Sequence, residues 1–407
     1  MDQIAPLTGP GERFQKIAQE LVPILRDHAE AADQSGTMSK ASFDAVVQSG
    51  FAAAFVPESL GGLGLDSVHD WLVGIATLAQ GDGSVAIGIS MHLGVSRGMA
   101  QGFYQAQAAG KSTAGSEAPL KAIANGDMLI CATATERGTD NLHPLTTAAQ
   151  VEDSWVINGQ KMFVTMSPVA THLAMNLRMQ DPEGDHLATT LMPIQTPGLQ
   201  PQDDWDALGM RGSGSQSVKF DNVKMPLRAV RRLGPWGRWS TQTLINRTLG
   251  NFVLVGAFFG IAAHAREIAY ANARKQKRLD APIINNPGVQ QTAGELEIEF
   301  VRCRALLAQT GRDLDTWLAE AAANPPDFER AHQLMQRYQA TKWSVNRGAI
   351  DIVDKALDLA GGGGYMNQGP LPRLYRDVRA GPFMQPHAAT DIRQYVGQVA
   401  LDIFPET

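Results

Sequence analysis

The segment MLICATATERGTDN, residues 128–141, decides the fold, because the spacing of apolar residues changes there. Upstream of it, apolar side chains recur at helical spacing, which predicts helices. The clearest run is Phe14, Ile17, Leu21 and Leu25. Downstream come short, partly alternating runs separated by turn sequences such as NG, PEGD and TPG, which predict strands.

The segment LGPWGRWS, residues 233–240, marks a return to long helical patterns. The paired prolines of ANPPDF, residues 323–328, separate two of these helices, because proline cannot continue a helix. The pattern predicts an α+β protein in three parts. We expect an N-terminal helical domain over 1–125, a middle β-domain of barrel or sandwich type over 126–237, and a C-terminal helical bundle over 238–407.

Composition limits the classes of function. The chain has 407 residues, of which 44% are hydrophobic and 19% charged, as in ordinary globular proteins. A net charge of −6 without a long basic run argues against nucleic acid as a partner. The apolar stretch NFVLVGAFFGIAAHAREIAY is interrupted by His264, Arg266 and Glu267, so it predicts a buried helix and no membrane span.

The start of the chain lacks the basic and then apolar pattern of a signal peptide. The two cysteines, Cys131 and Cys303, have no disulfide or metal-site spacing, and no metal site is expected. We therefore expect a cytoplasmic protein.

Several segments could carry chemistry, and each has a plainer explanation. Glycines 361–364 would let backbone approach a phosphate or a ring, but could equally end a helix. His92 and His387 could be functional or could be hydrogen-bonded core residues. Residues 133–141, TATERGTDN, offer hydroxyls and backbone donors to a polar ligand, or form a simple loop. Taken singly, these residues name no reaction.

Five segments in order resemble the acyl-CoA dehydrogenase superfamily, over nearly the whole chain. They are VPESLGGLGLD (56–66), ICATATERGTDNLHPLTTAAQ (130–150), WVINGQKMFVT (155–165), LGMRGSGSQSVKFDNVKMP (208–226) and LAGGGGYMNQGPLPRLYRDVRA (359–380). The resemblance implies N-terminal helices, a middle β-domain and a C-terminal four-helix bundle. It also implies a bound flavin, usually FAD with FMN possible, and a homotetramer.

The resemblance also assigns residues to the flavin. Those near the isoalloxazine ring would be Ile130, Ala132, Thr133, Gly138, Thr139, Phe163 and Thr165. Those toward the pyrophosphate and adenosine, partly across a subunit boundary, would be Arg274, Asp358, Gly361 and Gly362. The cofactor would perform the redox step, and the protein would bind, orient and tune it.

Departures from the family pattern bear on the reaction. The usual R.QFG reads RKQKR (274–278), Asp358 replaces a glutamine, and Glu136 is shifted into the loop. The usual catalytic glutamate is missing, and either Gln385 or His387 takes its position. We expect His387 to be the working group and Gln385 to fill space.

Some relatives carry the base on a bundle helix, where this chain has Asn246, Gly250 and Asn251.

Three hypotheses follow for the function. The favoured one is a flavin-dependent oxygenase acting with O2 on a small molecule or CoA thioester, in which Thr165, His92 and His387 supply donors in a dry pocket. The second is an acyl-CoA dehydrogenase that uses His387 or another base and passes electrons to a partner. The third is a flavin-binding scaffold without activity. One point argues against the first hypothesis: the segment VTMSP (164–168) lacks the serine-glycine pair that is common at Thr165–Met166 in oxygenases of the superfamily that the chain resembles.

Overall fold

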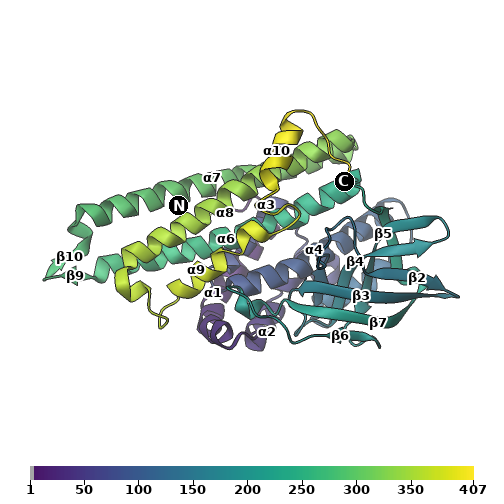
Figure 1. The fold of residues 1–407 in the computed structure, drawn as a ribbon, viewed down its shortest axis with the longest axis horizontal. Coiled ribbons are helices and arrows are strands. Elements are labelled where there is room, and N and C mark those ends of the chain that lie inside the picture. Colours follow the sequence, from purple (N-terminus) through teal and green to yellow (C-terminus); the bar gives the residue numbers. More distant parts are fainter. Residues whose placement is uncertain (1–3) are drawn as a thin grey trace.

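The computed structural model describes residues 4–407 and has helices before and after one large sheet. Figure 1 shows the sheet at one end of the molecule, with the long C-terminal helices running away from it and the N-terminal helices packed alongside. The N-terminal helices are α1 (Gly9–Ser35), α2 (Lys40–Gln48), α3 (Val68–Leu78), α4 (Gly83–Ala108) and α5 (Ala114–Ala124). The α+β fold is as expected.

The strands form one mixed sheet of eight strands in the described residues, with the order β6-β7-β3-β2-β4-β5-β8. They are β1 (Ile130–Thr133), β2 (Thr147–Val151), β3 (Ser154–Val164), β4 (His172–Asp181), β5 (Gly184–Pro193), β6 (Leu199–Pro201), β7 (Gln216–Pro226) and β8 (Val230–Pro235). Strand β1 lies parallel to the first half of β4, and β2 lies parallel to the second half. The main sheet therefore runs from Ile130 to Pro235, inside the expected range 126–237.

A bulge near the end of β3 distinguishes this strand from its neighbours. The register with β7 shifts between Lys161 and Val164, and Phe163 adopts a positive φ of 50°. A non-glycine residue in this region is strained, and such strain concentrates at functional sites. The bulge changes the direction of the Phe163 side chain just where the strand meets the helices.

The C-terminal part consists of three long helices and two short ones. They are α6 (Thr241–Lys275), α7 (Pro287–Ala323), α8 (Phe328–Gly364), α9 (Leu371–Val378) and α10 (Ile392–Ala400). A small hairpin of β9 (Lys277–Arg278) and β10 (Ala281–Pro282) follows α6. The expected four-helix bundle therefore has a short fourth member, α9, which packs against α6 and α8.

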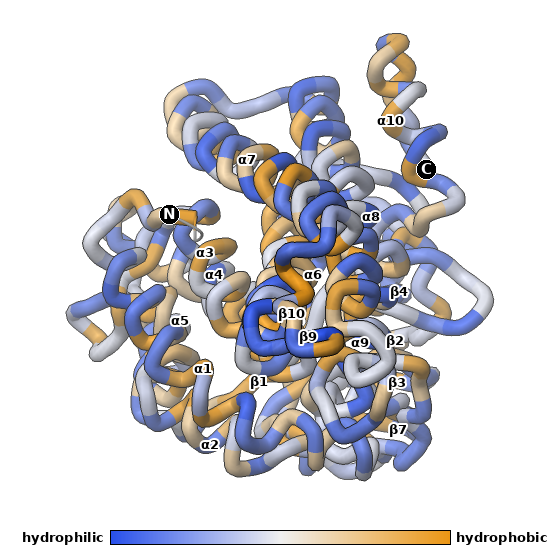
Figure 2. The backbone as a smooth tube through the Cα atoms, turned by 90° about the vertical axis from the view of Figure 1, so that its left-hand side faces the viewer, coloured by the Kyte–Doolittle hydropathy of each residue, from blue (hydrophilic) through white to orange (hydrophobic). Residues whose placement is uncertain are grey.

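Helix α6 forms the centre of the core. Figure 2 shows it as an apolar segment between α3 and α4 on one side and α7 and α8 on the other. A Cβ atom at Gly260 would lie 2.2 Å from the carbonyl oxygen of Ala76, so glycine allows α3 to cross this closely. One window of α6 is apolar enough to span a membrane, but 83% of that window is buried inside the protein. This matches the expected buried helix.

Helix α9 ties the C-terminal segment to the other parts. Its Arg373 pairs with Glu30 of α1 at 2.7 Å, and Arg376 pairs with Asp33 of α1 at 2.5 Å. The buried carboxylate of Asp377 accepts the backbone N–H of Met210 at 2.5 Å. These contacts explain the RLYRD motif, because they fix the point from which the following loop starts.

Candidate active site

The ends of β1 and β3 are fastened together side by side. The hydroxyl of Thr133 donates to the carbonyl of Met162 at 2.7 Å, and the N–H of Met162 donates to the carbonyl of Thr135 at 2.9 Å. The next residue, Phe163, leaves 48% of its side chain exposed and meets Trp205 edge to face at 5.9 Å. An exposed aromatic side chain on a rigid strand end is suited to pack against a planar ligand.

A chain of hydroxyls lies directly behind Phe163. Thr165 is nearly buried and shares a hydrogen bond of 2.9 Å with Ser215, which shares another of 2.8 Å with Ser213. Each hydroxyl can donate or accept, so the Thr165 hydroxyl can offer a proton donor to a group above it while Ser215 serves as its partner. The expected role of Thr165 near a flavin remains a prediction that this geometry allows.

The loop after β1 is held by a buried ion pair. The carboxylate of Glu136 accepts from the Lys161 ammonium at 2.5 Å and from the N–H groups of Leu145 and Thr146 at 2.7 and 3.1 Å. Both charged side chains are almost completely buried. The shifted glutamate of this loop is thus a structural anchor, and its oxygens are already used.

The other residues of this region that were predicted to contact the flavin are described by their burial, backbone conformation and internal hydrogen bonds. Ile130 is fully buried, and Ala132 is half-buried. Gly138 has a φ of 79° and open space around it. The Thr139 hydroxyl donates to the carbonyl of His143 at 2.6 Å, so it closes the loop internally.

Gln385, in place of the usual glutamate, reaches the loop after β1. Its side-chain oxygen accepts from the Asn141 amide at 2.6 Å, and its amide nitrogen donates to the hydroxyl of Thr135. Thr135 is in turn bonded to Met162, the neighbour of Phe163. Gln385 therefore joins the C-terminal part to the strand ends that carry Phe163 and Thr165.

His387 lies in a different environment, and the expectation that it is the working group is not supported by its contacts. Its ring stacks on Tyr395 of α10 at 4.2 Å and lies 6.4 Å from Trp239. Burial, and then the charge of Lys342, lowers its pKa to about 4, so it is neutral at pH 7. Of the two candidate positions, Gln385 is the one that contacts the strand ends.

His92 is a core residue, which corrects its expected catalytic role. One ring nitrogen, Nδ1, accepts the N–H of Ile130 at 3.1 Å, and the other, Nε2, donates to the carbonyl of Ala52 at 3.0 Å. Both nitrogens are therefore occupied by backbone groups, and the side chain is fully buried. His92 orients β1 against α4 and has no free nitrogen for a substrate.

Two residues of α8 that sequence reasoning missed hold the Gln385 loop. The buried Lys342 ammonium donates to the carbonyls of Met384 and, at 2.6 Å, His387. The Tyr338 hydroxyl donates to the carbonyl of Gln385 at 2.8 Å. The only signal for this contact in the sequence was a lysine on the apolar face of a helix. The partners of Lys342 and Tyr338 are backbone atoms of a distant loop, which the sequence pattern does not reveal.

The residues expected to contact the pyrophosphate and adenosine lie at the opposite end of the molecule. Arg274, Asp358, Gly361 and Gly362 are exposed. Gln276 bonds the carbonyl of Ala360 and so holds the two segments together. Figure 1 shows the end of α8 beside the β9–β10 hairpin, far from the sheet.

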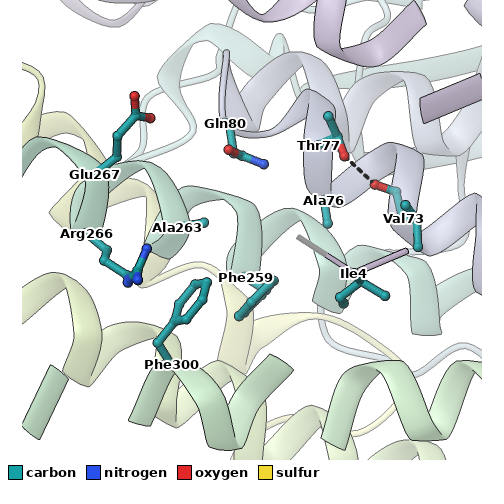
Figure 3. Close-up of a pocket in the computed structure, with 10 residues that line it drawn as sticks. All are labelled: Ile4, Val73, Ala76, Thr77, Gln80, Phe259, Ala263, Arg266, Glu267 and Phe300. Atoms are coloured by element: carbon teal, nitrogen blue, oxygen red, sulfur yellow. Dashed lines mark hydrogen bonds between the residues drawn. The ribbon is translucent and has the colours of Figure 1, made fainter. Parts of the chain in front are cut away.

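Two other features lie outside this region. A cavity of about 160 Å³ between α3, α6 and α7 is lined mainly by apolar side chains together with Gln80, Arg266 and Glu267, as Figure 3 shows, and no residue of the sheet lines it. At the β4–β5 turn, Asp181, Glu183 and His186 lie within 4.8 Å of one another. Arg232 pairs with both of those carboxylates, so the cluster already contains its cation.

Comparisons with known protein families match all three parts of the chain. The acyl-CoA dehydrogenase N-terminal domain matches residues 12–107, the middle domain 130–223 and the C-terminal domain 248–385. The chain belongs to the acyl-CoA dehydrogenase superfamily. The resemblance of the five motifs is thus confirmed, and so is the predicted fold class.

Members of the superfamily that are similar to this chain include amino sugar nitrososynthases. The amino sugar nitrososynthase DnmZ of Streptomyces peucetius is 33% identical over 97% of this chain and 95% of its own length. The L-evernosamine nitrososynthase of a Micromonospora species is 31% identical over 99% and 93%. The solved structure of KijD3 with FMN and dTDP-3-amino-2,3,6-trideoxy-4-keto-3-methyl-D-glucose has a TM-score of 0.89 at 29% identity, covering 99% and 96%.

Within the superfamily, the chain is a flavin-dependent oxidoreductase of the oxygenase branch, as expected. The scaffold hypothesis and the dehydrogenase hypothesis with His387 are not supported. The residues at the strand ends fit a flavin, because Phe163 offers an exposed aromatic surface and Thr165 a partnered hydroxyl beside it. A bound flavin in its reduced form would supply the activation of dioxygen.

Proposed function

We propose that this protein is an N-oxygenase that oxidises the amine of a nucleotide-linked amino sugar, with FMN as its flavin. The observation that carries the proposal is the placement of Gln385, an amide, against Thr135 and Asn141 where the family's dehydrogenases need a carboxylate. The full-length similarity to nitrososynthases supports the class of substrate.

An amide at position 385 suits this chemistry. Dehydrogenation of a thioester requires a base that removes a proton from carbon. An amine carries its own lone pair and needs no such base. In each round, one oxygen atom of O2 is added to nitrogen and the other leaves as water, while NAD(P)H supplies two electrons through a flavin reductase. One round gives a hydroxylamine, and a second round with loss of water gives a nitroso group.

The protein's own groups would bind and shield the reactants. Phe163 and Trp205 would support the flavin ring, and the Thr165 hydroxyl would donate a hydrogen bond near it. The loop that Lys342 and Tyr338 hold on α8 would cover the substrate side and exclude water.

Three further expectations belong to this proposal. We favour FMN over FAD because the residues matched to the adenosine half depart from the family pattern at Lys277, Arg278 and Asp358. We expect a homotetramer, as the family resemblance implies. We also expect a cytoplasmic enzyme, where a flavin reductase and NAD(P)H are available.

The proposal is tested by incubating the purified protein with FMN, a flavin reductase, NADPH and the amino sugar nucleotide of the KijD3 complex. Mass spectrometry should show the hydroxylamine and then the nitroso sugar, with the added oxygen derived from isotopically labelled O2. The control mixes the oxidised flavoprotein with butyryl-CoA without oxygen. Bleaching of the flavin by the thioester, with no oxygenated sugar, would contradict the proposal.

Changing Gln385 to alanine is expected to slow this reaction by about 10- to 30-fold. The substitution removes two hydrogen bonds, each worth about 1 kcal/mol, between the C-terminal loop and the loop after β1. Steady-state rates measure the effect, and Gln394→Ala, an exposed glutamine on α10, is the matched control. Equal rates for both variants would show that this tether does not matter for turnover.

A further inference from the structure

Arg247 of α6 has no ion-pair partner in the part of the chain that the structure describes. Its Nη2 atom is fully buried and has no hydrogen-bond partner among residues 4–407. Burial lowers the pKa of its guanidinium to about 10, which still leaves it charged at pH 7. A buried guanidinium nitrogen without a partner costs free energy, so its presence calls for an explanation.

The surroundings of Arg247 add positive charge. The pKa of the Lys161 ammonium is lowered to about 8, mainly by burial. Glu136 opposes this shift, and the positive charge of Arg247 adds to it, so the two cations lie near one another. Glu136 is already used by Lys161 and two backbone N–H groups. The group therefore keeps one uncompensated positive charge.

Two structural routes connect this turn of α6 with the loop of Gln385. Phe252, about 7.5 Å further along the helix axis, packs edge to face on Tyr338 at 6.4 Å. The Tyr338 hydroxyl donates to the carbonyl of Gln385. On the other route, Glu136 directly follows Thr135, which accepts from the Gln385 side chain. Arg247 therefore lies near the Lys161–Glu136 pair, which adjoins the loop that Gln385 contacts.

We propose that Arg247 binds a phosphate group of the substrate's nucleotide diphosphate. This inference rests on the proposed function, because that function supplies a substrate with a diphosphate. The planar guanidinium offers paired donors that match phosphate oxygens, and a charged hydrogen bond in a buried place is strong. Arg274, the arginine matched to the flavin's phosphates, lies 27 residues further along α6, about 40 Å away in the same protomer. A single phosphate therefore cannot contact both arginines of one protomer.

The experiment measures binding of dTDP, which carries the diphosphate but no amine, to the FMN-loaded protein by calorimetry. Arg247→Met should weaken dTDP binding by about 10- to 100-fold, the loss expected for a charged hydrogen bond. Arg247→Lys, which keeps the charge without the fork, should give an intermediate loss. Arg228→Met, at an exposed arginine in the turn between β7 and β8, is the matched control and should bind dTDP as the unchanged protein does.

Two further readouts separate ligand binding from other roles. The melting temperature of ligand-free Arg247→Met should not fall, because the change removes an unpaired buried charge. The proposal would be overturned if this melting temperature fell strongly and Arg247→Lys bound dTDP as tightly as the unchanged protein. FMN affinity of the apoprotein should be unchanged in Arg247→Met. Weakened FMN binding with normal dTDP binding would assign Arg247 to the flavin's phosphate and overturn the proposal.

The failure of this inference can be told apart from failure of the proposed function. If Arg247 variants bind dTDP normally while the amino sugar is still oxidised, only the inference is wrong. If dTDP binding depends on Arg247 but no amine is oxidised, the diphosphate site stands and the N-oxygenase proposal is wrong.

Discussion

Replacing Glu136 with glutamine is expected to destabilise the protein by about 3–5 kcal/mol, the usual cost of removing one partner of a buried ion pair. The change leaves the Lys161 ammonium completely buried without a carboxylate and close to the charge of Arg247. The loop that ends at Thr146 also loses its strongest acceptor. Denaturant and thermal unfolding at pH 7, followed by circular dichroism, measure the loss.

The double variant Glu136→Gln, Lys161→Met shows whether charge is the cause. It removes both partners, so it should regain most of the lost stability. Glu117→Gln, which breaks the exposed pair with Lys121, is the matched control and should cause no measurable change. If the double variant is as unstable as the single one, the loss comes from the loop's hydrogen bonds and not from an unpaired charge.

Acid should destabilise the protein through His92 by about 3 kcal/mol between pH 6.5 and pH 4. Burial lowers the pKa of His92 to about 4 in the folded state, although the hydrogen bond to Ala52 opposes the shift. In the unfolded chain the pKa is about 6.5, so between these values the unfolded state binds more protons. The contribution of His92 is therefore complete above pH 6.5 and is lost as the pH falls toward 4.

Comparison with His92→Gln isolates this effect, because every other titrating group is common to both proteins. Glutamine can still accept from the N–H of Ile130 and donate to the carbonyl of Ala52, but it does not titrate. Measured at pH 7.5, 6, 5 and 4.5, the unfolding free energy of the unchanged protein should fall relative to that of His92→Gln as the pH decreases. Parallel curves would mean that His92 does not charge on unfolding.

The order of local patterns predicted most of the fold. Helical spacing before residue 128, alternation after it and the prolines at 325 and 326 gave the three parts, since each depends on neighbours in the chain. The motif RLYRD could be recognised in the sequence. Its ion-pair partners Glu30 and Asp33 and its hydrogen-bond partner Met210 could not. Ion pairs across hundreds of residues leave no spacing in the sequence.

The candidate site was harder to predict, because it depends on where side chains point. Gln385 and His387 are two residues apart, and nothing local says which one faces the strand ends. The hydrogen bonds with Thr135 and Asn141 show that Gln385 is the residue that faces the loop after β1. The ring of His387 stacks on Tyr395 instead. His92 looked like a possible donor until both of its nitrogens were found on backbone atoms.

The sequence by itself determined the family, the flavin, the succession of helices and strands, and the loss of the usual glutamate. These follow from short-range patterns and residue identity, which a linear chain displays directly. Only the tertiary structure decided the contacts of Gln385, Lys342 and Glu136, and showed that Arg247 Nη2 has no hydrogen-bond partner in the described residues. Their chemistry depends on burial and on partners supplied by distant segments, so it exists only once the chain has folded.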